Sequence, residues 1–319
     1  MKGIAVTASL IRRWQPSWQT ILKRVVGKCE GVLVIKLRAR YRARMNRAEL
    51  TFDAVDDLVG AFLARKLGAP PAGQSFAPTQ IGPLIELAFQ SSSGRIGPLL
   101  ASPWLDRSTQ ANLRASLASP VNHWFDNNRD TGYLRTTYNP LDDTHEATRT
   151  GFFIATERAA KRLGFPVSVS QSLTAAIREM ESNIHEHSQL SETGILAFHA
   201  NAQAFEFVIA DCGLGVLATL QESPDYPSIT DHGLALQETL KEGASRYGRA
   251  ANRGMGFRDL FVGLASLNAD LRFRSGDHAL TISGPHPELK IARLAQKPFF
   301  QGFLASVRCA LPRAPHTLH

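Results

Sequence analysis

Residues 172–188 read SLTAAIREMESNIHEHS, and this stretch decides the fold that we expect for the chain. It contains no proline or glycine, and its apolar residues recur at the spacing of an amphipathic helix. Glu179, Asn183 and His187 recur every four residues, so a helix places them in one row at the edge of its buried face. A carboxylate and a carboxamide at this spacing can present oxygen atoms to a hydrated Mg²⁺ ion. An ordinary solvated helix face has the same spacing, so the row alone leaves both interpretations open.

A second motif follows in residues 204–216, which read AFEFVIADCGLGV. The pattern predicts a strand over 205–210, with Asp211 just after it, and Gly213 and Gly215 in the residues that follow. A buried carboxylate at a strand end can accept a hydrogen bond from an amino group such as the exocyclic amine of adenine. The two glycines remove side chains where a nucleotide would approach the backbone closely. They are equally typical of a tight turn after an edge strand.

A third motif, RGMGF at residues 253–257, precedes a predicted helix over 257–267. Gly254 and Gly256 would expose backbone N–H groups at the start of that helix, where phosphate oxygens bind. No P-loop sequence occurs in the chain. Basic side chains in the segment before the helix either pair with a γ-phosphate or carry incidental charge on a solvated loop. These side chains are Lys241, Arg246, Arg249 and Arg253.

The order ExxxNxxxH, then DxGxG, then GxG resembles the ATP-binding domain of the GHKL superfamily, which includes gyrase B subunits, histidine kinases, mismatch-repair ATPases and anti-sigma-factor kinases. The resemblance covers roughly residues 142–312. It implies a Bergerat-type α/β fold, a two-layer α+β sandwich with a mixed, mostly antiparallel sheet covered by helices. It also implies that Asn183 ligates Mg²⁺, that Glu179 positions or deprotonates the attacking water or hydroxyl, and that Asp211 contacts the adenine of ATP. His187 matches the family's frequent NxxEH ending, and a structural role for it stays open.

The end of the chain departs from the family pattern. Where the family often has Gly-Thr at the start of the last strand, this chain has Gly302-Phe303. We expect Thr281, on the preceding strand, to replace the missing polar contact near adenine. Two short strands, 271–274 and 279–282, are predicted to pair around the Ser-Gly-Asp sequence between them.

Some family variants do not fit. His145-Glu146 faintly resembles the phospho-acceptor box of sensor histidine kinases, but it lies only 38 residues before Asn183. That length is too short for a helical hairpin and a domain entry. The remaining resemblance is to stand-alone bacterial proteins related to anti-sigma-factor kinases.

The domain organisation follows from these motifs. Residues 141–312 are expected to form the ATP-binding domain, and 313–319 a loose tail. Residues 1–140 are expected to form an amino-terminal domain whose fold and role the sequence does not assign. Periodicity predicts helices over 48–67, 81–89 and 148–163, and a hairpin of two strands over 194–199 and 205–210.

Charge is unevenly distributed along the chain. The formal net charge is +8, but residues 1–48 hold twelve Lys or Arg and one acid, so the remainder is net negative. This basic segment is either a surface for nucleic acid or an acidic partner, or a solvated basic stretch.

Composition narrows the class of protein. The three cysteines lie far apart and form no zinc-ligand spacing, and no apolar run approaches the ~18 residues that span a bilayer. We therefore expect a cytoplasmic protein that is not inserted in a membrane. Its expected function is that of an ATP- and Mg²⁺-binding signalling regulator, acting as a switch or as a Ser/Thr kinase on a protein partner. A nucleotide-gated nucleic-acid-binding protein and a catalytically dead binding module are the alternatives, and a homodimer is left open.

Overall fold

The computed structural model describes residues 47–64, 75–77, 79–92, 117, 122–137, 143–226, 228–239, 269–284 and 291–311. The basic segment before residue 47, the helix predicted over 257–267 and the tail at 313–319 lie outside these residues.

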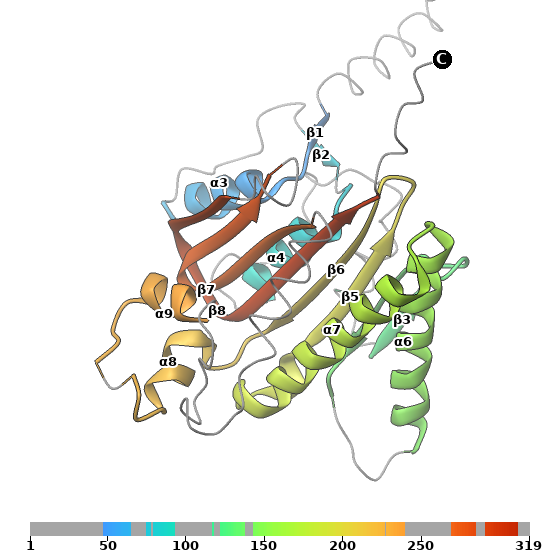
Figure 1. The fold of residues 1–319 in the computed structure, drawn as a ribbon. Coiled ribbons are helices and arrows are strands. Elements are labelled where there is room, and N and C mark those ends of the chain that lie inside the picture. The colour runs from blue at the N-terminus through green and yellow to red at the C-terminus, as the bar shows by residue number, and fades with distance from the viewer. Residues whose placement is uncertain are drawn as a thin grey trace, which may run out of the picture.

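A six-stranded sheet in the order β3-β4-β5-β6-β8-β7 forms the centre of the molecule (Figure 1). All neighbouring strands in it are antiparallel. A second, two-stranded parallel sheet pairs β1 (Arg47–Glu49) with β2 (Ser75–Ala77). The predicted α/β class and the mostly antiparallel sheet are thus confirmed. The strands of the large sheet are β3 (His123–Phe125), β4 (Thr131–Arg135), β5 (Ile195–Ala200), β6 (Ala204–Asp211), β7 (Ala269–Ser283) and β8 (Ile291–Ala310).

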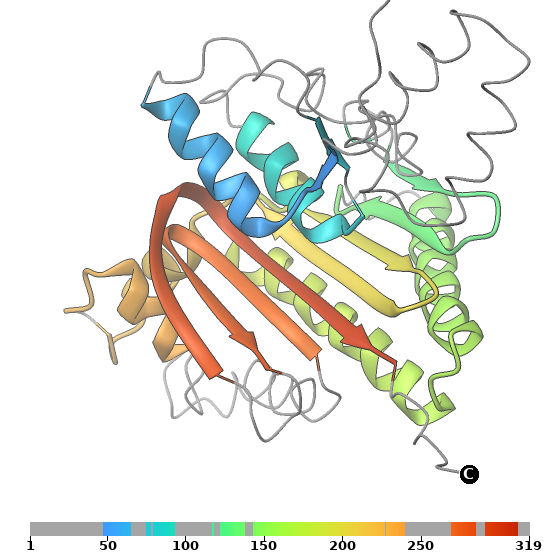
Figure 2. The same ribbon diagram turned by 90° about the horizontal axis from the view of Figure 1, so that it is seen from above.

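Helices cover both faces of this sheet (Figure 2). On one face lie α6 (Asp143–Arg162) and α7 (Val167–His187), and on the other lie α3 (Phe52–Leu63) and α4 (Ile81–Ser92). A third layer therefore occupies the face that a two-layer sandwich leaves open. None of the described helices is long and apolar enough to cross a membrane. Shorter helices are η3 (Ser191–Thr193), and α8 (Gly215–Gln221) and α9 (His232–Glu238), which pack against β7.

Strand β6 shows why the sequence forms a covered central strand. Phe205, Phe207 and Ile209 lie in the core beneath α6 and α7, whereas Val208 and Ala210 lie in the core beneath α3 and α4. A strand between two helical layers is buried on both faces, so its sequence is a nearly continuous apolar run. This explains the AFEFVIA sequence that precedes Asp211, and the β5–β6 hairpin predicted from it is confirmed.

Helix α7 is the predicted organising helix. It starts at Val167, five residues before the stretch that predicted it, and ends at His187. Its buried stripe faces the sheet and consists mainly of the predicted apolar residues, Leu173, Ile177, Met180 and Ile184.

The large sheet contains residues from both sides of position 140. Strand β4 pairs with β5, and Leu134 of β4 belongs to the same core as α6 and α7. The hydroxyl of Thr131 also lies 2.8 Å from Nδ1 of His199 on β5. The described residues before position 140 thus share a core with those after it.

The predicted hairpin over residues 271–282 is wrong. The structure has one strand, β7, whose two halves both pair with β8, with register shifts between Ser275 and Gly276 and between Gly276 and His278. The Ser-Gly-Asp sequence predicts a turn, but these residues form a β-bulge, in which Gly276 has a positive φ. The strand predicted to begin at Gly302 is the second half of β8.

Candidate functional site

The end of α7 meets the turn that follows β6. The N–H of Leu214 donates a hydrogen bond to the carbonyl oxygen of Ser188 at 2.9 Å. A Cβ atom on Gly213 would lie 2.1 Å from the same oxygen, so only glycine permits this approach. The contact brings the last turn of α7 to the DxGxG motif.

Asp211 lies at the floor of this junction, at the end of β6. Its side chain is only 4% exposed, and its Oδ1 accepts a hydrogen bond from the N–H of Gly213 at 2.7 Å. Burial raises the pKa of Asp211 to about 6, while the Gly213 N–H opposes the rise. The carboxylate is therefore mostly ionised at pH 7, in a place where water competes little for its oxygens.

The row of polar residues on α7 runs towards this turn. Glu179 is exposed, whereas Asn183 and His187 are half-buried. At 1.5 Å per residue Glu179 lies ~6 Å before Asn183 along the helix, and His187 lies ~6 Å after it. The hydroxyl of Thr219, on α8, contacts the carbonyl oxygens of both His187 and Gly215. The structure thus brings the carboxy-terminal end of the row to the Asp211 turn.

Ser275, which belongs to none of the three sequence motifs, joins three segments at this site. Oγ of Ser275 accepts a hydrogen bond from the N–H of Val216 and donates one to the carbonyl oxygen of Gly302, both at 2.9 Å. Gly215 has a φ of +77°, which bends the chain so that Val216 faces this hydroxyl. The sequence predicts a turn at Ser275, but this residue continues the alternation of Leu271 and Phe273 on the core face of β7. That alternation is the signal in the sequence that could have identified it.

The two glycines of the DxGxG motif pack against the chain itself. The space beside Gly213 is filled by Ser188, and a Cβ atom on Gly215 would lie 2.7 Å from Oγ of Ser275. The tight-turn interpretation of these glycines therefore describes their packing better than close approach to a nucleotide.

Thr281 does not lie with this group. It pairs with Arg293 on β8, whereas Asp211 pairs with Phe303. Ten residues of extended strand separate the two partners, about 33 Å of chain length. Because β7 is one continuous strand instead of a hairpin, it carries Thr281 away from Asp211, and Ser275 takes the place near the turn.

The remaining predicted site residues, Arg253, Gly254 and Gly256, lie outside the described residues. The same holds for Lys241, Arg246 and Arg249. Their contribution to phosphate binding stays a prediction.

The described residues provide few ligands for a metal ion. No three His, Cys, Asp or Glu side chains among them could hold a metal together. Mg²⁺ often takes one or two protein oxygens and completes its shell with phosphate and water. The half-buried carboxamide of Asn183 fits such a shared site, but not a site made by the protein alone.

Comparison with known proteins identifies no relative: no family model, no curated protein and no solved structure matches this chain. The GHKL resemblance therefore stays a prediction carried by the three motifs. The junction of α7 with the Asp211 turn is the geometry that bears on it.

Proposed function

We propose that this chain is a nucleotide-dependent regulatory protein, which binds ATP with Mg²⁺ through a GHKL-like site and acts as a switch or a Ser/Thr kinase on a protein partner. The observation that carries the proposal is the contact between Ser188 and the Gly213–Leu214 turn. It joins the end of the ExxxNxxxH row to the DxGxG turn, and these two motifs follow each other in the same order as in GHKL proteins. In this proposal the large sheet with α6 and α7 corresponds to a Bergerat-type domain, to which α3 and α4 are an addition.

Asp211 gives the site its selectivity for adenine. An ionised and buried carboxylate accepts a hydrogen bond from the exocyclic amine of adenine and rejects the carbonyl that guanine has at the same ring position. The hydrogen bond from Gly213 fixes the orientation of the carboxylate and leaves its other oxygen for the base.

Asn183 and Glu179 act at the phosphate end. Oδ1 of Asn183 is the protein ligand for Mg²⁺, and the bound nucleotide supplies an activated γ-phosphoryl group. Glu179, exposed one turn earlier on α7, orients the attacking water or hydroxyl and accepts its proton. The α7 row thus acts in transfer of the γ-phosphoryl group, while the Asp211 turn recognises the adenine base.

One labelling experiment separates the forms of this function. The full chain is incubated with γ-labelled ATP and Mg²⁺, alone and with lysate of the source cell. Label on a protein partner identifies a kinase, released phosphate identifies an ATPase, and saturable binding without either identifies a switch. Asn183→Ala should abolish turnover, whereas Ser182→Ala, an exposed neighbour on α7, should not change it. Absence of binding, transfer and hydrolysis in the wild type would refute the proposal.

The alternative function is nucleotide-gated binding of nucleic acid. The observation that favours it is the concentration of twelve basic residues in the first 48 positions. Phosphate contacts by such a segment would make binding strongly dependent on salt.

A further inference from the structure

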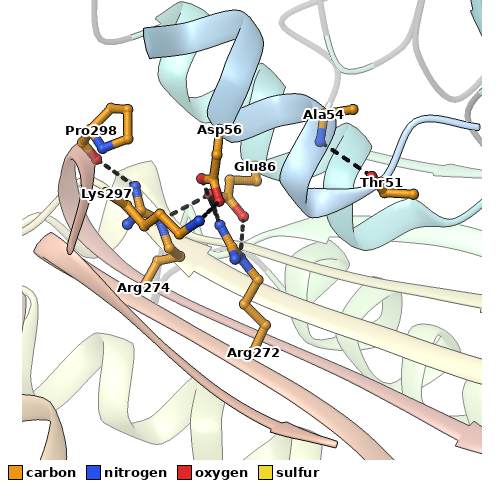
Figure 3. A network of polar contacts seen from close by, with 8 residues as sticks. All are labelled: Thr51, Ala54, Asp56, Glu86, Arg272, Arg274, Lys297 and Pro298. Atoms are coloured by element: carbon orange, nitrogen blue, oxygen red, sulfur yellow. Dashed lines mark hydrogen bonds and ion pairs between the residues drawn. The ribbon is translucent and has the colours of Figure 1, made fainter. Parts of the chain in front are cut away.

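A network of buried charges joins the α3/α4 layer to the last two strands (Figure 3). Arg272 of β7 donates to Glu86 of α4 at 2.9 Å and 3.0 Å, and to Asp56 of α3 at 2.8 Å. Arg274 of β7 donates to the same Glu86 at 2.9 Å, and Lys297 of β8 lies 2.8 Å from Asp56. Helices α3 and α4 thus contact β7 through the guanidinium groups of Arg272 and Arg274.

These charges are deeply buried, so each of them needs a partner of opposite charge close by. Arg272 is 4% exposed and Arg274 is fully buried. Moving charges out of water is costly, and apolar side chains of similar size would hold two layers together as well or better. Removing one partner of a buried pair, however, leaves the other charge uncompensated. The network therefore contributes little by simple attraction, but a shift of β7 against α3 and α4 that separates these charges would be costly.

The two arginines are compensated unequally. Burial alone would lower the pKa of Arg272, but the carboxylates of Glu86 and Asp56 outweigh it and raise that pKa. Burial lowers the pKa of Arg274, which shares Glu86 and lies beside Arg272. Nη2 of Arg274 donates to the carbonyl oxygen of Pro298 at 2.5 Å, while its Nη1 has no hydrogen-bond partner within the described part of the chain. Arg272 is therefore the member that ties both carboxylates to the strand.

The same part of β7, residues 272–275, also contacts the turn of the candidate site. Side chains alternate between the two faces of a strand, so Arg272 and Arg274 face α3 and α4, while Phe273 and Ser275 face α7 and the turn after β6. Ser275 is adjacent to Arg274 and binds both Val216 and Gly302. A displacement of β7 on one face therefore moves the serine on the other.

We propose that the α3/α4 layer positions the Asp211 turn through β7, with Arg272 and Arg274 as positioning residues that act through Ser275. Loss of the ion pairs on one face of β7 then loosens the turn on the opposite face of the sheet. The functional meaning rests on the proposed nucleotide site, but the mechanical link between the two faces does not.

Native-state amide exchange of the full chain, without nucleotide, tests this link. Arg272→Met removes the charge that ties β7 to both helices. The exchange rate of the Val216 N–H should then rise about two- to thirtyfold more than that of Val208, a core residue of β6 that reports global opening. Equal rises at Val216 and Val208 would overturn the proposal.

A matched control separates this link from general weakening of the α4 layer. Arg308 pairs with Glu206, which also accepts a hydrogen bond from the first N–H of α4. Arg308→Met breaks an ion pair on the same face of the sheet but leaves Arg272, Arg274 and their carboxylate partners in place, since Arg308 lies opposite Asp270 on β7. It should raise exchange at Val216 no more than at Val208, and a selective rise there would contradict the proposal.

Two milder variants keep the test decisive if Arg272→Met does not fold. Arg272→Lys keeps the charge but loses the forked geometry, so exchange at Val216 should lie between the wild type and Arg272→Met. Lys297→Met removes a cation at the rim of the network that is 23% exposed, and it should raise exchange at Val216 selectively but less. No selective rise in either variant would refute the link. Because no nucleotide is present, failure here is distinct from failure of the proposed function.

Discussion

The carbonyl oxygen of Ser188 accepts a hydrogen bond from Leu214, and Gly213 packs against the same oxygen without a side chain between them. This contact fixes the end of α7 on the turn that begins with Asp211. The polar row on α7 and Asp211 can belong to one site only if the contact between Ser188 and Leu214 persists in solution.

Gly213→Ala should break this contact. The added methyl group would lie 2.1 Å from a backbone oxygen that cannot rotate away, so we expect a loss of about 1–3 kcal/mol in the free energy of unfolding. Gly151→Ala is the matched control, because no atom lies within 4 Å of the added group in α6. It should raise stability by up to ~1 kcal/mol. Urea unfolding measures both, and equal stability of the two variants would show that the Ser188 contact is not close.

Asp211→Asn should change the pH dependence of stability. The folded-state pKa is raised from its ordinary 3.8 to about 6, so the stability that Asp211 contributes in its neutral form is present below pH ~4 and is lost as the pH rises to ~6. Asparagine does not titrate. Between pH 3 and pH 7 the variant should therefore gain about 3 kcal/mol relative to the wild type. Parallel stability curves for the two proteins would show that Asp211 is not desolvated.

The polar contact near the turn is assigned to Ser275, and two substitutions test this. Ser275→Ala leaves the Val216 N–H without its acceptor, so we expect a loss of about 1–3 kcal/mol in stability and weaker binding of ATP. Thr281→Ala should change neither by a measurable amount, since Thr281 lies six residues further along β7. Thermal unfolding and ATP titration report the two quantities. Loss of binding in Thr281→Ala alone would restore the assignment made from the sequence.

The four longer helices α3, α4, α6 and α7 and the β5–β6 hairpin were predictable because their patterns are local. The four-residue row and the apolar stripe of α7 lie within one segment, and the run before Asp211 identifies a covered strand. The bulge at Ser275 was not predictable in this way. A Gly in a short polar sequence suits a turn and a bulge equally, and only pairing of both halves of β7 with the long strand β8 decides between them.

The helical layer formed by α3 and α4 could not be placed on the sheet from the sequence. The helices that became α3 and α4 were predicted. The face of the sheet that they cover, however, depends on pairs such as Asp56 with Arg272, which are separated by 216 residues. Arg272 and Arg274 inside an apolar strand indicate buried acidic partners, but the sequence does not show which acidic residues these are.

The basic amino-terminal segment gives a separate prediction. If the alternative function holds, the full chain binds DNA or RNA with an affinity that falls steeply with salt, and deletion of residues 1–46 removes both the binding and the salt dependence. This deletion keeps β1 intact. Fluorescence anisotropy at several salt concentrations measures it, with the ATP affinity of the truncated chain as the control for folding.

Equilibrium titration of the full chain with ATP in the presence of Mg²⁺ is the most direct test of the central claim. We expect saturable binding at one site in the wild type, weaker by about a hundredfold in Asp211→Asn, because one buried charged hydrogen bond is worth ~3 kcal/mol. GTP should compete poorly. A folded wild-type protein that binds no adenine nucleotide up to millimolar concentration, or an Asp211→Asn variant that binds ATP as well as the wild type, would contradict the claim that Asp211 holds the base.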